Sequence, residues 1–408
     1  MKNAIAGVAG VLVTVLTAAS AAGQDKPPAI SGDTVKIGVV TDLSGVNIDY
    51  GGPSAVIAAQ MAADEFGGKV LGKPIEILAV DHQNKPDVAS QKVRQWFDQD
   101  GVDMVTELLN SSVALAVAKI ADEKKRIAMV VGAATTRLTN EDCNPYTVQY
   151  AFDTYALAYG TANAVTKLGG KSWYFITADF SFGQNLEKDT TAMVLAAGGK
   201  VLGASRHPAF QGIDFSSFVL SAQGSGADVI GLANSSNDTV NAVKMADEFG
   251  VFPKQKLAAL LMQISDIHGL TLEVSKGLLF TDGWYWDLND ETRAFAKNFQ
   301  VRAKRYPGMV QAGTYSATLQ YLKAVEATRT DEPDVVMSYL KKMKINDVFA
   351  RGGYIRADGR MVHDMYLAEV KTPQQSKGPW DYYNIRSVIS AEETVIPLKD
   401  SKCPLVKK

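Results

Sequence analysis

The stretch "TVKIGVVTDLSG", Thr34–Gly45, sets the pattern on which the predicted fold depends. Residues 35–41 are almost all apolar and favour a buried strand, which runs into a polar turn at Gly45. The following "GGPSAVIAAQMAADEFGG" has Pro53 where helices begin and apolar residues at helical spacing as far as Phe66. A buried strand followed by such a helix is the repeating unit of a parallel sheet.

The same unit recurs through the first 150 residues. "KPIEILAVDHQNKP" reads as the next strand with its polar loop, "DVASQKVRQWFDQDG" as a helix, and "VDMVTELL" as a strand. The triplet Asn110-Ser111-Ser112 then starts a helix, and "KKRIAMVVGAATT" is the next strand and loop. This alternation predicts a parallel sheet with helices on both faces.

The alternation restarts after "NPYTVQYAFDTYALAYG", residues 144–160. We therefore predict an α/β protein of two Rossmann-like lobes, each built on a parallel central sheet. A long helix in "VQAGTYSATLQYLKAVEATRT" returns to the first lobe, and Asp358-Gly359 indicates a hairpin between two late strands. The chain then crosses between the lobes three times, near Phe152, Trp284 and Arg351.

These crossings divide the chain into four predicted parts. They are a signal peptide (1–22), lobe 1 (34–152 plus 285–350), lobe 2 (153–284 plus 351–390) and a C-terminal tail (391–408). Residues 1–22 have Lys2, an apolar run and small residues suited to cleavage near Ala22, so we expect export; the alternative is a membrane anchor.

The chain has two cysteines, too few for a zinc site without other ligands. In an oxidising compartment a Cys143–Cys403 disulfide would hold the C-terminal tail, and two free thiols are the alternative.

Composition and motifs argue against several classes of function. A formal net charge of -2 gives no reason to expect a nucleic-acid or anionic-membrane partner. The sequence has no glycine-rich phosphate loop after a strand, no histidines at metal-ligand spacing and no nucleophile elbow. We therefore expect no enzyme activity, cofactor or metal, and we look to the polar loops at the carboxyl ends of the strands, where open α/β sheets bind ligands.

Two such loops carry the same triplet, Asn110-Ser111-Ser112 and Asn234-Ser235-Ser236. Each triplet follows an apolar run and precedes a helical pattern ending in Ala-Asp-Glu, so we expect equivalent positions in two lobes; chance and glycosylation signals are the alternatives. Ser111 and Ser235 are expected to face a cleft, whereas for Ser112 helix capping explains the residue at least as well.

The motifs "VKIGVVTDLSG", "VGAATTRLT" and "ADFSFGQNLEKD", in this order, resemble type I periplasmic binding proteins of the leucine/isoleucine/valine-binding branch. The resemblance extends from about Val35 to about Leu398. It implies a three-segment hinge, a cleft that closes on a small-molecule ligand, a periplasmic location and a monomer. It also implies ABC permease and ATPase subunits as partners.

The resemblance also implies a binding site between the lobes. Ser111, with the Ala133–Thr135 loop, corresponds to the family's carboxylate-binding positions, and helix N-termini suit an anion for physical reasons. The other expected ligand-binding residues are Tyr50, Asn110, Phe182, Ser235 and Gln263.

The chain departs from the family where amino-acid binders place an acidic residue for the α-ammonium. That stretch, "LAALLMQISD", is apolar through Met262 and reaches Asp266 late. A buried ammonium without an anionic partner is costly, so we expect an organic acid, with Phe182, Tyr50 and "GWYW" as candidate aromatic surfaces. Packing of "GWYW" in the hinge and core explains these aromatic residues equally well.

The alternatives to a receptor for an organic acid are a receptor for an amino acid, a sensor that docks to a signalling protein, and an exported enzyme.

Overall fold

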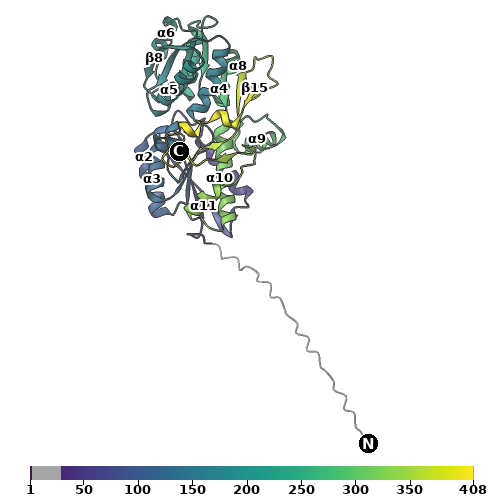
Figure 1. The fold of residues 1–408 in the computed structure, drawn as a ribbon. Helices are drawn as coiled ribbons and strands as arrows, with labels where there is room; N and C mark the ends of the chain where they lie inside the picture. Colours follow the sequence, from purple (N-terminus) through teal and green to yellow (C-terminus); the bar gives the residue numbers. More distant parts are fainter. Residues whose placement is uncertain (2–28, 408) are drawn as a thin grey trace.

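The computed structural model describes Met1 and residues 29–407, and Figure 1 shows two α/β lobes, one above the other. The predicted cleavage site near Ala22 lies outside the described residues. No helix among residues 29–407 is both long enough and apolar enough to span a lipid bilayer.

The first sheet confirms the alternation read from residues 34–150. Its strand order is β2-β3-β1-β4-β5-β6, with all pairs parallel except β2–β3. The strands that carry the site, β1, β4 and β5, are buried almost throughout, as their apolar sequences require. The six strands are β1 (Val35–Thr41), β2 (Lys69–Val70), β3 (Lys73–Asp81), β4 (Met104–Glu107), β5 (Ile127–Val130) and β6 (Thr147–Gln149).

Helices from two distant parts of the sequence cover this sheet. The long α10 is buried along most of its length and packs against α1, so residues beyond 285 do return to the first sheet. The helices are α1 (Gly52–Glu65), α2 (Pro86–Gln95), α3 (Ser111–Lys124), α9 (Asp290–Ala303), α10 (Met309–Thr328) and α11 (Pro333–Leu340).

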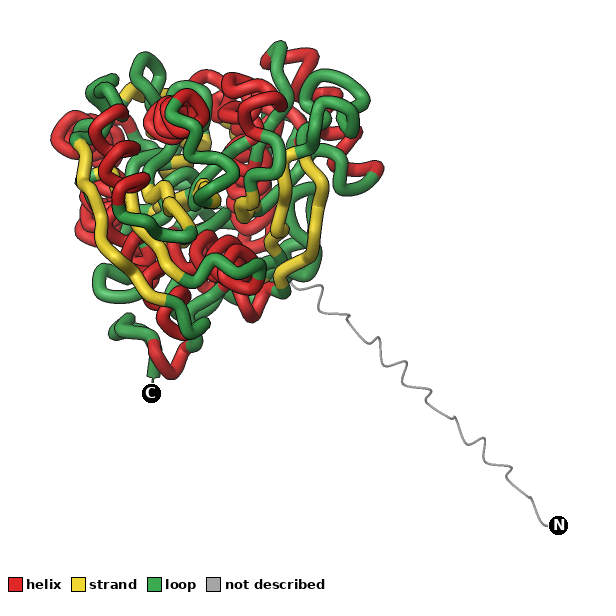
Figure 2. Tube along the Cα trace, turned by 90° about the horizontal axis from the view of Figure 1, so that it is seen from above, coloured by secondary structure: helices red, strands yellow, loops and turns green. Residues whose placement is uncertain are grey.

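The second sheet has the order β15-β14-β11-β10-β9-β7-β8. Its first five strands in sequence are parallel, and β14 and β15 add an antiparallel edge. In Figure 2, β8 lies on the left and β14 and β15 on the right. The strands are β7 (Ser172–Ala178), β8 (Lys200–His207), β9 (Val229–Ala233), β10 (Lys256–Ala259), β11 (Leu279–Asp282), β14 (Met365–Val370) and β15 (Tyr383–Ile389).

Five helices pack on the second sheet. Two of them, α5 and α7, begin at the carboxyl ends of β7 and β9 and so point their N-termini toward the other lobe. The five are α4 (Thr154–Lys167), α5 (Ser181–Ala196), α6 (Ser216–Gly224), α7 (Ser236–Glu248) and α8 (Ile264–Ser275).

The predicted hairpin turn at Asp358-Gly359 is present between β12 (Tyr354–Ile355) and β13 (Met361–Val362). The hairpin joins the first sheet, because the Gln149 backbone N–H donates to the Gly359 carbonyl over 3.0 Å. We accordingly propose that the third crossing lies between β13 and β14, later than the predicted position near Arg351.

A buried ion pair holds two of the crossing segments together. The Arg360 Nε lies 3.0 Å from an Asp153 carboxylate oxygen, and both side chains are at most 3% exposed. The Arg360 guanidinium also donates to the Gln149 and Tyr150 carbonyls. The hinge thus contains a buried ion pair. Removal of either side chain would leave the other charge buried without a partner.

The predicted disulfide is confirmed. Cys143 and Cys403 are bonded, with their Cα atoms 5.6 Å apart across a sequence separation of 260 residues. Both cysteines are buried, and the Lys402 backbone N–H donates to the Asn140 side chain beside them. The C-terminal tail is therefore fixed to the first lobe.

Replacing both cysteines by serine should lower the free energy of unfolding by about 2–4 kcal/mol, because the bond restricts the unfolded chain. Urea unfolding followed by circular dichroism measures the loss. Dithiothreitol should reproduce that loss in the native chain and have no effect on the double variant; equal stability of the two chains would contradict the expectation.

Candidate ligand-binding site

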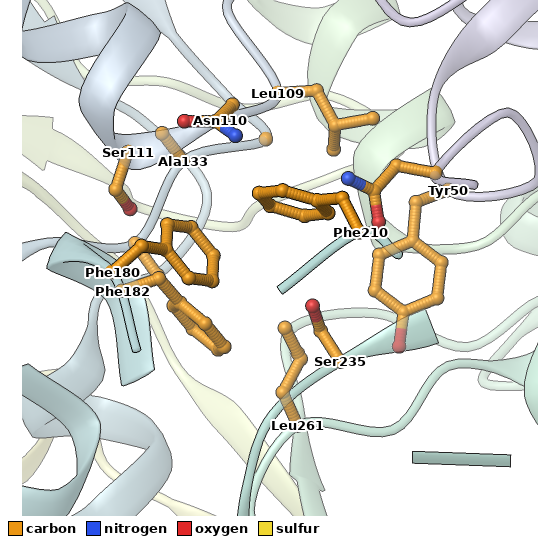
Figure 3. Close-up of a pocket in the computed structure, with 13 residues that line it drawn as sticks. Tyr50, Leu109, Asn110, Ser111, Ala133, Phe180, Phe182, Phe210, Ser235 and Leu261 are labelled. Carbon is orange, nitrogen blue, oxygen red and sulfur yellow. The ribbon is translucent and has the colours of Figure 1, made fainter. Parts of the chain in front are cut away.

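A pocket lies between the two lobes, where about 320 Å³, part of it open to solvent, is not occupied by atoms. Six of the eight residues expected at the site line it: Tyr50, Asn110, Ser111, Ala133, Phe182 and Ser235. Figure 3 shows Ser111 and Ser235 projecting toward the pocket from opposite lobes. The pocket is therefore formed by both lobes.

Asn110 caps the N-terminus of α3 in the first lobe. Its side-chain oxygen accepts hydrogen bonds from the backbone N–H groups of Ser112 (2.8 Å) and Val113 (3.2 Å). The Ser111 hydroxyl accepts from the Thr135 N–H over 3.3 Å, so its own proton can be donated into the pocket. The capping by Asn110 thus leaves Ser111 as the donor at this helix N-terminus.

The second triplet is placed one residue earlier relative to its helix. The Asn234 side-chain oxygen accepts from the Thr239 hydroxyl over 2.8 Å and so braces the first turn of α7. Ser235 is the N-cap residue of α7, but its side chain makes no capping hydrogen bond and instead lines the pocket.

The last serine of each triplet contacts the opposite lobe. The Ser112 hydroxyl donates to the Ser181 hydroxyl over 3.3 Å, and the Ser236 hydroxyl donates to the Val46 carbonyl over 2.7 Å. The two triplets thus share the places of their serines: the middle serine lines the pocket and the last serine contacts the opposite lobe. They differ in register, because Asn110 is the N-cap of α3 whereas Ser235 is the N-cap of α7.

Tyr50 is the centre of a third set of contacts between the lobes. Its hydroxyl donates to an Asp266 carboxylate oxygen over 2.5 Å and accepts from the Ser236 N–H over 2.9 Å. The same Asp266 oxygen accepts from the Gln263 N–H over 2.8 Å. Burial raises the pKa of Asp266 to about 7, and the hydrogen bond from Tyr50 opposes that rise.

Apolar side chains form the remaining walls, and three of them are phenylalanines of the second lobe. The Phe180 ring lies 5.9 Å from the Phe182 ring and 4.8 Å, nearly edge to face, from the Phe210 ring. No lining residue carries a charged side chain in the part of the chain that the structure describes. The pocket is therefore neutral, with hydroxyls at the triplets and aromatic surfaces beside them.

Seven lining residues were not expected from the sequence: Asn47, Leu109, Gly132, Ala134, Phe180, Phe210 and Leu261. Phe180 could have been found, because it stands two positions before Phe182 in the loop "ADFSFG". Phe210 lies in the loop between β8 and α6, which carries no motif.

Two expected ligand-binding residues do not line the pocket. The Thr135 side chain is buried and accepts from the Arg137 N–H, while its backbone supports Ser111. Gln263 caps α8 together with Asp266. Their contacts with a ligand stay predictions.

The aromatic segment Trp284–Trp286 packs in the interior and does not line the pocket. Trp284 is 1% exposed and donates from its indole to the Val348 carbonyl over 2.9 Å. The packing explanation for this segment agrees with the structure.

Residues 34–379 match the family model described as "Periplasmic binding protein". The chain belongs to the periplasmic binding protein family. Members of this family are the substrate-binding components of ABC transporters, and this chain is a solute-binding receptor with the type I fold predicted from its sequence.

Solved structures agree with this assignment. A periplasmic binding protein from Burkholderia mallei superposes with a TM-score of 0.90 at 51% identity, covering 92% of this chain and 100% of that one. A branched chain amino acid ABC transporter periplasmic ligand-binding protein from Burkholderia xenovorans gives 0.83 at 36% identity over 92% and 100%. A Rhodopseudomonas palustris solute binding protein, in complex with 4-hydroxybenzoate, gives 0.80 at 22% identity over 88% and 97%.

Among curated proteins, Leu/Ile/Val-binding protein homolog 4 of Brucella abortus is 25% identical over 314 residues, which cover 74% of this chain and 73% of that protein. The resemblance to the leucine/isoleucine/valine-binding branch is thus confirmed.

The protonated form of Asp266 should stabilise the receptor. Its folded-state pKa of about 7 lies above the ordinary value of 3.8, so this stabilisation is complete below about pH 4 and is lost as pH rises through about 7. Asp266→Asn keeps a neutral acceptor for Tyr50 and Gln263. The variant should therefore become more stable relative to the native chain as pH rises from 5 to 8.

Urea unfolding of both chains at several pH values measures this difference. The other titrating groups contribute equally to the free energy of unfolding of both chains, so their contributions cancel. Asp247→Asn, at an exposed position of α7, is the matched control, and its stability relative to the native chain should not change with pH. A stability of Asp266→Asn relative to the native chain that stays constant or falls as pH rises would contradict the role assigned to this carboxyl.

Proposed function

We propose that this receptor binds a small aromatic carboxylate in the pocket between its lobes and delivers it to ABC permease and ATPase subunits. It performs no reaction on the ligand. Residues 1–22 direct its export to the periplasm, where it acts as a monomer.

One observation carries the ligand class: the pocket combines neutral hydrogen-bond donors with aromatic walls and has no charged lining side chain. The Ser111 hydroxyl stands at the N-terminus of α3, where the helix dipole favours an anion. The rings of Phe180, Phe182 and Phe210 provide the apolar surface that a benzene ring would bury.

An α-amino group has no suitable partner in this pocket. Asp266 is the nearby carboxyl of the second lobe, but it does not line the pocket, and Tyr50 and Gln263 already occupy one of its oxygens. A buried ammonium would therefore lose its hydration without gaining a counter-charge.

The solved structures support aromatic acids as the first ligands to test. Rhodopseudomonas palustris binding proteins of the same fold are in complex with 3,4-dihydroxy benzoic acid, 4-hydroxybenzoate and benzoate. Branched-chain amino acids are the second candidate class, because the Burkholderia xenovorans and Brucella proteins are named for these ligands.

A ligand would act by favouring the closed arrangement of the lobes. Ser111 and Ser235 reach the pocket from opposite lobes, so a ligand between them gains both sets of contacts only when the cleft is shut.

A ligand panel tests the proposal. Purified mature protein is heated with benzoate, 4-hydroxybenzoate, hexanoate, leucine and valine, each in turn. A ligand present at 100 times its Kd should stabilise the protein by about 2.7 kcal/mol, which a thermal-shift measurement resolves. Strong shifts with leucine or valine and none with the aromatic acids would overturn the proposed ligand class.

Ser111→Ala should weaken binding of the aromatic acid by roughly 1.5–3 kcal/mol, since it removes a hydrogen bond to a charged group. Isothermal titration calorimetry measures the change in Kd. Ser221→Ala, at an exposed position on α6, is the control and should leave Kd unchanged. Unaltered affinity in Ser111→Ala would remove this residue from the site.

A further inference from the structure

Phe210 stands apart from the other residues of the loop between β8 and α6. The neighbouring Pro208, Gln211 and Gly212 are exposed, whereas Phe210 is half-buried and lines the pocket. In Figure 3 its ring lies between Phe180 and Tyr50, near the centre of the pocket. The loop therefore directs one aromatic side chain into the binding cleft.

The backbone of Phe210 is in a conformation that bulky residues rarely adopt. Its φ is 65°, in the left-handed region, where the Cβ atom crowds the following carbonyl. A strained residue of this kind persists only where its surroundings fix it, and such residues concentrate at functional sites.

Both ends of the loop are fixed by burial. His207 is 0% exposed and Phe215 is 1% exposed, and their rings meet edge to face with centroids 4.9 Å apart. Phe210 thus lies in a short segment held between two buried anchors.

A third anchor comes from the helix of the second triplet. Asp238, in the first turn of α7, is 8% exposed, and its interaction with the Phe210 backbone N–H opposes the rise in its pKa that burial causes. Ser235 lines the pocket from the start of the same helix. Helix α7 therefore positions both the Ser235 hydroxyl and the Phe210 ring.

We propose that Phe210 is a specificity-determining residue, whose ring forms one wall of a slot for the ligand's aromatic ring, and that Asp238 is the residue that positions it. This inference rests on the proposed function. Phe180, whose ring is in contact with that of Phe210, and Phe182 form the adjoining walls, so an aromatic ligand meets three rings that can pack against its face and edge. A saturated ring of similar size buries similar area but lacks the complementary charge distribution of an aromatic ring.

The two probes are benzoate and cyclohexanecarboxylate, and calorimetry gives the ratio of their Kd values for each variant. Phe210→Leu should weaken benzoate by roughly 2- to 13-fold, the contribution of one aromatic pair, and change cyclohexanecarboxylate much less. Phe210→Tyr keeps the ring and should keep the native ratio. Asp238→Ala, which removes the acceptor, should shift the ratio in the same direction as Phe210→Leu.

Phe66→Leu is the matched control, because Phe66 is also half-buried but follows α1 in the first lobe and does not line the pocket. An unchanged ratio in Phe210→Leu, or an equal shift in Phe66→Leu, would overturn the inference while leaving the proposed function standing. A native protein that binds neither probe, but does bind leucine or valine, would overturn both.

Discussion

The structure depends on how the buried start of α3 satisfies its backbone N–H groups. The first N–H groups of a helix have no partner within the helix, and inside a cleft water cannot supply acceptors reliably. Asn110 accepts two of them with one oxygen, and this sets where the next residue points. Ser111 consequently has its hydroxyl available for a ligand, supported from behind by the Thr135 N–H. At the start of α7 the capping differs, but Ser235 likewise lines the pocket, from the opposite wall.

The contacts between the lobes connect this helix geometry to closure. Tyr50, from the loop before α1, bonds both to Asp266 of α8 and to the backbone of Ser236 at the start of α7. Gln311 of α10 in turn donates to the Tyr50 carbonyl over 2.7 Å, which ties Tyr50 to the late helix of the first lobe. Opening the cleft would break the bonds to Asp266 and Ser236 together. Closure is therefore a change between two discrete arrangements, and a ligand needs to favour only one of them.

The fold could be predicted from the sequence because its signals are local and repeated. Apolar strands such as β1 and β4, each followed by a polar turn and a helix, determine a parallel sheet without reference to the rest of the chain. The triplets could be found for the same reason, since they stand where such strands end. The hairpin of Asp358 and Gly359 shows the limit: its turn is a local signal, but its attachment to β6 is a contact between segments 210 residues apart in sequence.

The roles of individual site residues were harder to predict, because they depend on contacts made across the cleft. Asn110 was expected to bind ligand, and it lines the pocket, but its oxygen is used to cap α3. Asp266 comes late in its stretch and was not among the residues expected at the site, yet Tyr50 from the other lobe donates a hydrogen bond to it. Phe210 could not be predicted from a sequence motif, because its position depends on a loop that is held by buried residues and by Asp238.

The electrostatics of the cleft favour an anionic ligand even though no cation lines the pocket. Among the acidic groups near it, burial raises the pKa of Asp266 to about 7, that of Asp238 to about 6 and that of Glu107 well above its ordinary value. The Glu107 carboxyl lies beneath Gly132 at the pocket wall, where a Cβ on that glycine would come within 2.8 Å of its oxygen. A protonated Glu107 does not repel a carboxylate, whereas an ionised one at this depth would. The neutral donors and the helix dipole at Ser111 thus act beside Asp266 and Glu107, whose charged forms burial disfavours.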